Sequence, residues 1–332
     1  MRRAALFAPG KRRAAFNAMN SASPSLGSVP APIVPNPALV SDLVADLLFE
    51  EAASRDARAA GRVPGPRTGF EALDREVGGF LAPGVHTLLA APGAGKTALC
   101  LQIAARCGCP ALYVSAEMRR VELLRRLIAR ETGEFLGKLR GGQLDGERLR
   151  LLACRAAAQT PQLALFDAQE AAMLPGGAGA SPNAIAARAV ALKERFESEH
   201  LLVVIDSVTE WAPLALGGEA LGGASSEYAL AEAAVNGLKN LASVLRCPVI
   251  AIAHRHRAAQ GAGADRLHGA KGTGRFEYVS ESVWDLERDL KNRPNQNECS
   301  FVDLTLLKNR YGAVGTTVRF CFEGRVQKFS PA

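Results

Sequence analysis

Nearly continuous apolar runs alternate with amphipathic stretches from residue 68 to residue 254. The apolar runs predict buried strands at residues 85–91, 111–117, 163–167, 201–206 and 248–254. Helical spacing of apolar residues between them predicts helices near 70–77, 97–105, 119–131, 134–158, 181–200 and 226–246. Apolar strands that alternate with helices are typical of a parallel sheet covered on both faces.

The pattern changes in the last fifth of the chain. Three further strands are expected near residues 282–288, 300–309 and 316–328, and here apolar and polar positions alternate more regularly. Short turns between such strands are typical of antiparallel pairing. The sequence therefore predicts an α/β fold whose mostly parallel sheet, flanked by helices, is extended by antiparallel C-terminal strands.

Two segments precede this domain. Residues 38–60 repeat apolar positions at helical spacing, beginning with Leu39, Val40 and Leu43, and predict an amphipathic helix that packs on its own domain or on a neighbouring subunit. Residues 1–37 are rich in Ala, Pro, Ser and Arg without any period, which predicts a disordered basic tail. We therefore divide the chain into a tail (1–37), a linker helix and linker (38–64) and one domain (65–332).

Composition excludes some classes of protein. No apolar run reaches the roughly 18 residues of a membrane span. The seven cysteines have no metal-type spacing, and their odd number favours reduced thiols in the cytoplasm. Residues 1–41 carry five basic and no acidic residues, out of a net charge of +7, so the overall charge says little about the domain itself.

A phosphate-binding loop is predicted between the strand at 85–91 and the helix after it. Ala91, Pro92, Gly93, Ala94, Gly95, Lys96, Thr97 and Ala98 form its glycine-rich turn and the helix start. Glycines let backbone N–H groups cradle phosphate, Lys96 would reach the β- and γ-phosphates of ATP, and the Thr97 hydroxyl would bind Mg²⁺. A chance Gly-Lys-Thr in a tight turn is the other interpretation, and the correct placing of strand and helix disfavours it.

Three polar residues follow predicted strands at the edge where ligands gather in α/β folds. Asp206 would hold Mg²⁺, Glu117 would activate the attacking water, and His254 would contact the γ-phosphate. Each of these residues also has a purely structural interpretation. Asp206 could cap a turn, Glu117 could be an acid at a helix start, and His254 could simply end a strand.

Five segments now resemble one known family in the same order. They are TGFEALDREVGGF (68–80), AAPGAGKTAL (90–99), SAEM (115–118), LVVIDS (202–207) and LKNRYGAVGT (307–316). Together they resemble the ATPase domain of DnaB-type replicative helicases, which belongs to the RecA-like P-loop superfamily. The resemblance covers about residues 65–330.

The resemblance implies roles that the residues alone do not. It implies that Glu117 is the catalytic base, that Asp206 binds Mg²⁺, and that Lys308 and Arg310 act in the site of the next subunit. From their spacing alone, Lys308 and Arg310 would be an ordinary basic strand end. It also implies a homo-oligomer, hexameric in this family, with active sites between subunits and with residues 38–60 docked on a neighbour.

Some features depart from the family pattern. The segment before residue 65 is too short for the family's primase-interacting domain, so we expect none here. His254 stands where these helicases usually have glutamine, and KGTGR (271–275) replaces the family's Arg-Glu-Ser-Gly pattern.

A basic, glycine-rich segment at 255–275 is the candidate nucleic-acid contact. Its cations are Arg255, Arg257, Arg266, Lys271 and Arg275, and it has no aromatic residue for base stacking. In a ring, this loop would face the channel and follow the backbone of single-stranded DNA. A solvated basic loop is the alternative.

Three functions remain open: a DnaB-like ring motor on single-stranded DNA, a RadA-like recombination or repair ATPase, and a KaiC-like nucleotide switch that binds no DNA.

Overall fold

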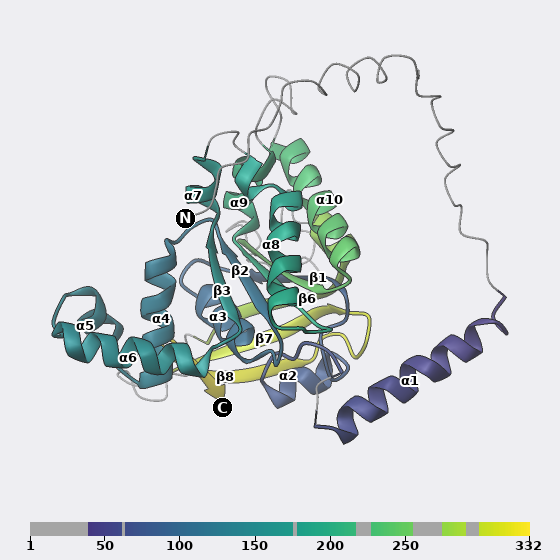
Figure 1. Cartoon of the computed structure of the whole chain (residues 1–332), viewed down its shortest axis with the longest axis horizontal. Helices are drawn as coiled ribbons and strands as arrows, with labels where there is room; N and C mark the ends of the chain where they lie inside the picture. Colours follow the sequence, from purple (N-terminus) through teal and green to yellow (C-terminus); the bar gives the residue numbers. More distant parts are fainter. Residues whose placement is uncertain (1–38, 62–63, 175–177, 217–226, 255–273, 290–298) are drawn as a thin grey trace, which may run out of the picture. The chain divides into compact units, whose positions relative to one another are not determined.

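The computed structural model describes residues 39–61, 64–174, 178–216, 227–254, 274–289 and 299–332 (Figure 1). Contacts divide the chain into two units, residues 1–54 and residues 55–332, which we describe separately. In the described residues, no helix is both long and apolar enough to cross a membrane.

The larger unit is built on one sheet. In the described residues its strand order is β3-β2-β4-β5-β1-β6-β7-β8-β9. Pairing is parallel from β3 through β6 and antiparallel from β7 onward. The strands are β1 (Gly84–Ala90), β2 (Ala111–Ser115), β3 (Leu163–Asp167), β4 (Leu202–Asp206), β5 (Pro248–His254), β6 (Ser280–Arg288), β7 (Ser300–Asn309), β8 (Thr317–Glu323) and β9 (Lys328–Pro331).

The described helices of this unit lie before β1 or between successive parallel strands in the sequence. They are α2 (Glu71–Glu76), α3 (Lys96–Arg106), α4 (Arg120–Thr132), α5 (Leu136–Arg140), α6 (Gly146–Gln159), α7 (Ala168–Ala172), the short 3₁₀ turn η1 (Ala178–Ala180), α8 (Pro182–Arg195), α9 (Val208–Leu216), α10 (Glu227–Leu245) and α12 (Gly274–Val279).

Each face of the sheet has its own apolar core. On one face, α3 buries Leu99 and Ile103 against the strands, and α2 and α4 add to the same cluster. Helices α8, α9 and α10 lie together on the other face (Figure 1), where Trp211 of α9 and Leu238 of α10 belong to the same apolar cluster as residues of α8. Because both faces are covered, the central strands are apolar on both sides, as the sequence pattern predicts.

The main strands and helices confirm the prediction, and some details correct it. The strand predicted at 111–117 ends at Ser115. Helix α9 follows β4 in a stretch for which the sequence pattern predicts no helix, and the single strand predicted at 316–328 is two strands, β8 and β9, joined by a turn. Strand β6 is parallel to β1, so the antiparallel part begins at β7.

Helix α8 begins at the residues where the sequence predicts a helix start. The Ser181 hydroxyl accepts a hydrogen bond from the Ala184 amide at 3.3 Å, and Pro182 takes the first position, where no N–H is needed. The helix ends at Arg195 instead of near residue 200.

The smaller unit contains most of α1 (Leu43–Ala59), which confirms a helix within residues 38–60. No residue of α1 is buried, and Leu47, Leu48 and Phe49 are 59%, 61% and 76% exposed. The tail predicted at 1–37 lies outside the described residues.

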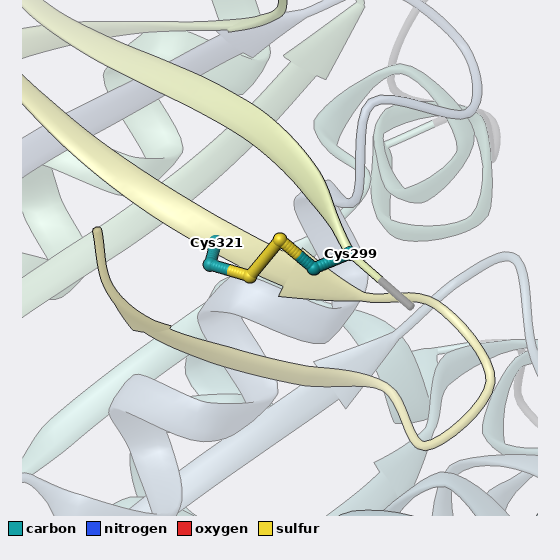
Figure 2. Close-up of a disulfide and its surroundings, with 2 residues drawn as sticks. All are labelled: Cys299 and Cys321. Atoms are coloured by element: carbon teal, nitrogen blue, oxygen red, sulfur yellow. A yellow bond between two sulfur atoms is a disulfide. The ribbon is translucent and has the colours of Figure 1, made fainter. Parts of the chain in front are cut away.

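A disulfide corrects the expectation of reduced cysteines. Cys299 and Cys321 are bonded, with their Cα atoms 5.7 Å apart (Figure 2). Cys321 lies opposite Phe301 on the neighbouring strand, which brings it close to Cys299. Because 22 residues separate the two cysteines in sequence, only the β7–β8 pairing reveals their proximity. The other cysteines are free thiols: Cys100, Cys107, Cys109, Cys154 and Cys247.

Candidate functional site

The predicted phosphate site lies at the carboxyl edge of the parallel strands. Ser115 pairs with Asp206 and Ala90 pairs with His254, so β2, β4, β1 and β5 end side by side. Glu117 is two residues beyond the end of β2. The register therefore brings Lys96, Glu117, Asp206 and His254 together, as the sequence predicts.

The loop after β1 has the backbone that a phosphate cradle requires. Gly93 and Gly95 have φ angles of +76° and +102°, which side-chain-bearing residues rarely adopt. A Cβ on Gly95 would also come within 2.9 Å of the Phe329 ring. Helix α3 then begins at Lys96 with no side-chain cap, so its first N–H groups remain available to an anion.

Lys96, His254 and Glu117 form a chain of contacts. The Lys96 Nζ lies 2.8 Å from His254 Nδ1, and His254 Nε2 lies 2.9 Å from Glu117 Oε1. A neutral imidazole with its proton on Nε2 satisfies both contacts, since it accepts from Lys96 and donates to Glu117. His254 thus joins Lys96, the candidate phosphate-binding lysine, to the candidate base.

Burial and neighbouring polar groups shift the pKa values of Lys96 and Glu117, the two ends of this series of contacts. Burial lowers the pKa of Lys96, and the charges of Glu117 and Asp206 offset part of that effect. Burial is also the largest influence on the pKa of Glu117 and raises it, but the polar neighbours, His254 and Lys96 among them, together hold that pKa below its usual value. Glu117 is therefore ionised at neutral pH, as a base must be.

Asp206 has the features of a metal-binding carboxylate. It is buried, its Oδ2 accepts a hydrogen bond of 2.6 Å from the Tyr113 hydroxyl, and its Oδ1 has no hydrogen-bond partner in the described part of the chain. Burial raises the pKa of Asp206, with Tyr113 and Thr97 acting in the opposite direction. An ionised Asp206 would be stabilised by a cation at its open oxygen.

These residues fit Mg²⁺. Within the described ranges, no three His, Cys, Asp or Glu side chains converge on a metal site. Mg²⁺ does not require such a cage, because it is commonly held by few protein ligands together with phosphate and water. Thr97 and Asp206 would hold the ion, which would neutralise charge on the phosphates.

Lys308 and Arg310 lie at the opposite edge of the sheet. Strand β7 is antiparallel to β6 and ends beside the amino end of that strand, with Asn309 paired to Ser282. The seven residues of β1 separate the two edges by roughly 20 Å at about 3.3 Å per residue. The structure therefore does not bring Arg310 to the Lys96 of its own chain.

Arg310 is held by an acid that sequence reasoning missed. Its Nη1 lies 3.1 Å from Glu281 Oε1, its backbone N–H donates to the Glu281 carbonyl at 3.0 Å, and the Tyr311 hydroxyl donates to Glu281 Oε2 at 3.2 Å. Gly84 makes room for this carboxylate, since a Cβ there would collide with Glu281 Cγ. Nothing in the local sequence around Glu281 marks it.

Tyr113 was also missed. It lies in the middle of β2, fully buried, and burial raises its pKa well above the usual value, so the neutral hydroxyl donates to Asp206. A hydroxyl-bearing residue in an otherwise apolar run before Glu117 was the available signal.

The predicted nucleic-acid contacts cannot be placed. Arg255, Arg257, Arg266 and Lys271 lie outside the described residues, and Arg275 is described only by its backbone in α12.

Comparison with known proteins assigns the family. The family described as "DnaB-like helicase C terminal domain" matches residues 65–331, most of the chain. The chain belongs to this family. Its sheet, with a parallel core and antiparallel C-terminal strands, is the RecA-like fold.

A relative supports the DnaB-like assignment over most of the chain. The replicative DNA helicase DnaB of Treponema pallidum (strain Nichols) is 29% identical over 274 residues, which is 80% of this chain and 56% of the relative. The chain thus spans about half the length of the curated DnaB proteins that it matches.

Solved structures share the fold of this DnaB-like domain. One is an isolated ATPase domain, which covers 90% of this chain and all of its own, with a TM-score of 0.71 and 22% identity. Another, a DnaB-like replicative helicase studied for its interactions with primase, covers 89% of this chain and 67% of its own, with a TM-score of 0.67 and 22% identity.

Proposed function

We propose that this chain is an ATP-hydrolysing, Mg²⁺-dependent ring motor that moves on single-stranded DNA. Lys96 and the loop 91–98 bind the phosphates, Thr97 and Asp206 bind Mg²⁺, and Glu117 activates water. Membership of the DnaB-like family supports this choice over other P-loop enzymes.

One observation carries the proposal. The phosphate site and the pair Lys308 and Arg310 occupy opposite edges of one sheet. An arginine that cannot reach its own phosphate site can complete the site of an adjacent copy, and a head-to-tail contact of this kind gives a ring when the rotation between copies closes. The arrangement therefore suits a homo-oligomer, a hexamer in our proposal, with active sites between subunits.

Helix α1 is the second proposed contact between copies. Its exposed apolar residues, Leu47 and Leu48 among them, would be covered by a neighbouring subunit. Changing both to glutamate should shift the protein to smaller species in sedimentation velocity. Matched changes at Glu50 and Glu51, to lysine, should leave the distribution of species largely unaltered if the apolar side makes the contact.

An ATPase assay with and without single-stranded DNA tests the whole proposal. The parent protein should hydrolyse ATP with Mg²⁺, DNA should stimulate turnover, and Lys96→Ala should abolish turnover. Absence of hydrolysis by well-folded protein would refute the motor.

The DNA contact has its own test. Log affinity for single-stranded DNA should fall with log salt by about 0.7 per phosphate contacted. Alanine at Arg266, Lys271 and Arg275 should flatten this slope and remove the stimulation, whereas alanine at three exposed arginines of α6 (Arg148, Arg150 and Arg155) should not. The assay should use protein that starts near Pro37, because the basic tail also attracts DNA.

Two outcomes would select the other candidate functions. A protein that hydrolyses ATP but neither binds DNA nor is stimulated by it would support a KaiC-like switch. Binding and stimulation without strand separation would support a RadA-like recombination or repair ATPase.

A further inference from the structure

A cavity of about 550 Å³ opens beside Glu117, outside the phosphate loop. It lies between the start of α4 and the end of α5, and we call it the arginine pocket. Its lining residues are Glu117, Met118, Arg119, Val121, Glu122, Arg125, Arg126 and Arg140.

The arginine pocket has an excess of positive charge. Three guanidinium groups share one carboxylate, since Glu122 lies 3.2 Å from Arg125, 3.8 Å from Arg126 and 3.6 Å from Arg140. The second carboxylate, Glu117, is engaged by His254 at 2.9 Å. Four guanidinium groups therefore face two carboxylates that already have cationic or hydrogen-bonding partners.

Part of this arrangement is held in place before any ligand arrives. The Arg126 side chain is 15% exposed, its Nη1 donates to Gln327 Oε1 at 3.0 Å, and its Nε lies 3.4 Å from the Met118 sulfur. Glu122 is 19% exposed and also contacts Arg125 and Arg140. A pre-organised cluster loses less entropy when it binds an anion.

We propose that the arginine pocket binds a phosphate anion, from inorganic phosphate up to the polyphosphate of a nucleotide. Guanidinium groups bind phosphate oxygens in bidentate geometry and keep their charge at all physiological pH values. The volume falls within the usual range of small-molecule sites, roughly 300–1,000 Å³. Val121 and Met118 add an apolar wall, which a nucleoside could contact.

Two sources could supply this anion. Glu117 borders both the arginine pocket and the phosphate site, so phosphate released by hydrolysis would pass into the pocket. This source rests on the proposed function. The other source is a free nucleotide from solution, which would place a regulatory ligand next to the catalytic base.

Calorimetric titration of full-length protein carrying Lys96→Ala tests the proposal, because this change weakens the P-loop site. Pyrophosphate should bind this protein saturably. Adding Arg119→Ala and Arg125→Ala should weaken binding at least tenfold, since each removes a charge-assisted contact. The matched control, Arg150→Ala with Arg155→Ala on α6, removes the same charge elsewhere and should leave the affinity within about twofold.

Equal weakening by both pairs, or no saturable binding to the Lys96→Ala protein, would overturn the proposal. If the alanine pair unfolds the protein, Arg119→Lys with Arg125→Lys retains the charge and should still bind pyrophosphate more weakly, because ammonium lacks the bidentate fork. Titrations with inorganic phosphate and with ADP then identify the source. Tighter binding of phosphate would indicate the product of hydrolysis, and tighter binding of ADP would indicate a nucleotide from solution. The measurement requires no turnover, so a failure of ATP hydrolysis would not alter its result.

Discussion

The side chains at the carboxyl edge touch one another in a fixed order, Lys96 to His254 to Glu117. A phosphate that draws Lys96 away removes one of the two contacts of His254. The imidazole can then turn, and Glu117 is released toward water. At the residue scale, His254 would thus connect phosphate binding to Glu117, the proposed base, which is the role expected from its position after β5.

The first prediction concerns Glu117. Replacing it with glutamine should leave ATP binding close to that of the parent, because in the proposed function the loop 91–98 and Lys96 hold the phosphates. Turnover should fall by about 10²–10⁴-fold, the usual contribution of a general base. Steady-state hydrolysis and a separate nucleotide-binding measurement check this.

Glu147→Gln on the exposed start of α6 is the control, and it should turn over normally. Unimpaired hydrolysis by Glu117→Gln would leave Glu117 as an ordinary acid at a helix start.

A second residue-scale prediction concerns stability and pH. His86 is buried, with Nδ1 and Nε2 each 2.8 Å from a partner, the Ser282 hydroxyl and the Ala82 carbonyl. Burial lowers its pKa in the folded protein. Its unfolded pKa is about 6.5, so its contribution to stability is full above that pH and is lost as pH falls from 6.5 toward the folded pKa.

Denaturant unfolding between pH 7.5 and pH 5 measures this effect. Below pH 6.5, the free energy of unfolding of the parent should fall by up to about 1.4 kcal/mol per pH unit more than that of His86→Gln. This slope is the maximum that the uptake of one proton on unfolding can give. Parallel curves for the two proteins would show that His86 does not titrate on unfolding.

At the scale of elements, the signals that are local in sequence were read correctly. The apolar runs predicted the central strands. The start of α8, marked by Ser181 and Pro182, was also predicted. Pairs of residues that meet only through antiparallel pairing were not predicted. Glu281 and Arg310 are brought together by the antiparallel β6–β7 register, and Cys299 and Cys321 by β7–β8. No local pattern states a register between distant strands, which is why both pairs were missed.

The third prediction tests one such pair. Glu281 is 14% exposed at its side chain and orients Arg310, whose side chain is 52% exposed. Because Arg310 is half-exposed, losing this contact should raise the activation free energy by only about 1 kcal/mol. Glu281→Gln should therefore slow turnover about fivefold. Nucleotide binding should be unaffected, because Glu281 lies at the other edge of the sheet.

The exposed pair Glu71 and Arg75, 3.4 Å apart, supplies a matched control, and Glu71→Gln should leave turnover unchanged. Adding Arg310→Ala to Glu281→Gln should produce no loss beyond that of Arg310→Ala alone if Glu281 acts only through Arg310. A further loss in the double variant would show that Glu281 has another role.

For the whole molecule, the decisive feature is the separation of the two edges. The phosphate loop follows the carboxyl end of β1, and Arg310 lies beside the amino end of β6. Under the proposed function, a single chain would therefore carry two halves of a site that it cannot join by itself. Assembly into a ring would make hydrolysis a property of the interface, since each site would draw Lys96 from one subunit and Arg310 from the next.

The last prediction follows from this geometry. Lys96→Ala and Arg310→Ala should each be nearly inactive, since an arginine supplied in trans contributes about 10³–10⁵ in rate. Mixed before assembly in equal amounts, they should recover activity, because about a quarter of the interfaces would pair an intact Lys96 with an intact Arg310. Lys96→Ala mixed with the Lys96→Ala/Arg310→Ala double variant forms no such interface and should stay inactive. If rings proven to be mixed recover nothing, Arg310 does not act in the neighbouring site, and the two edges of the sheet would have to serve separate purposes.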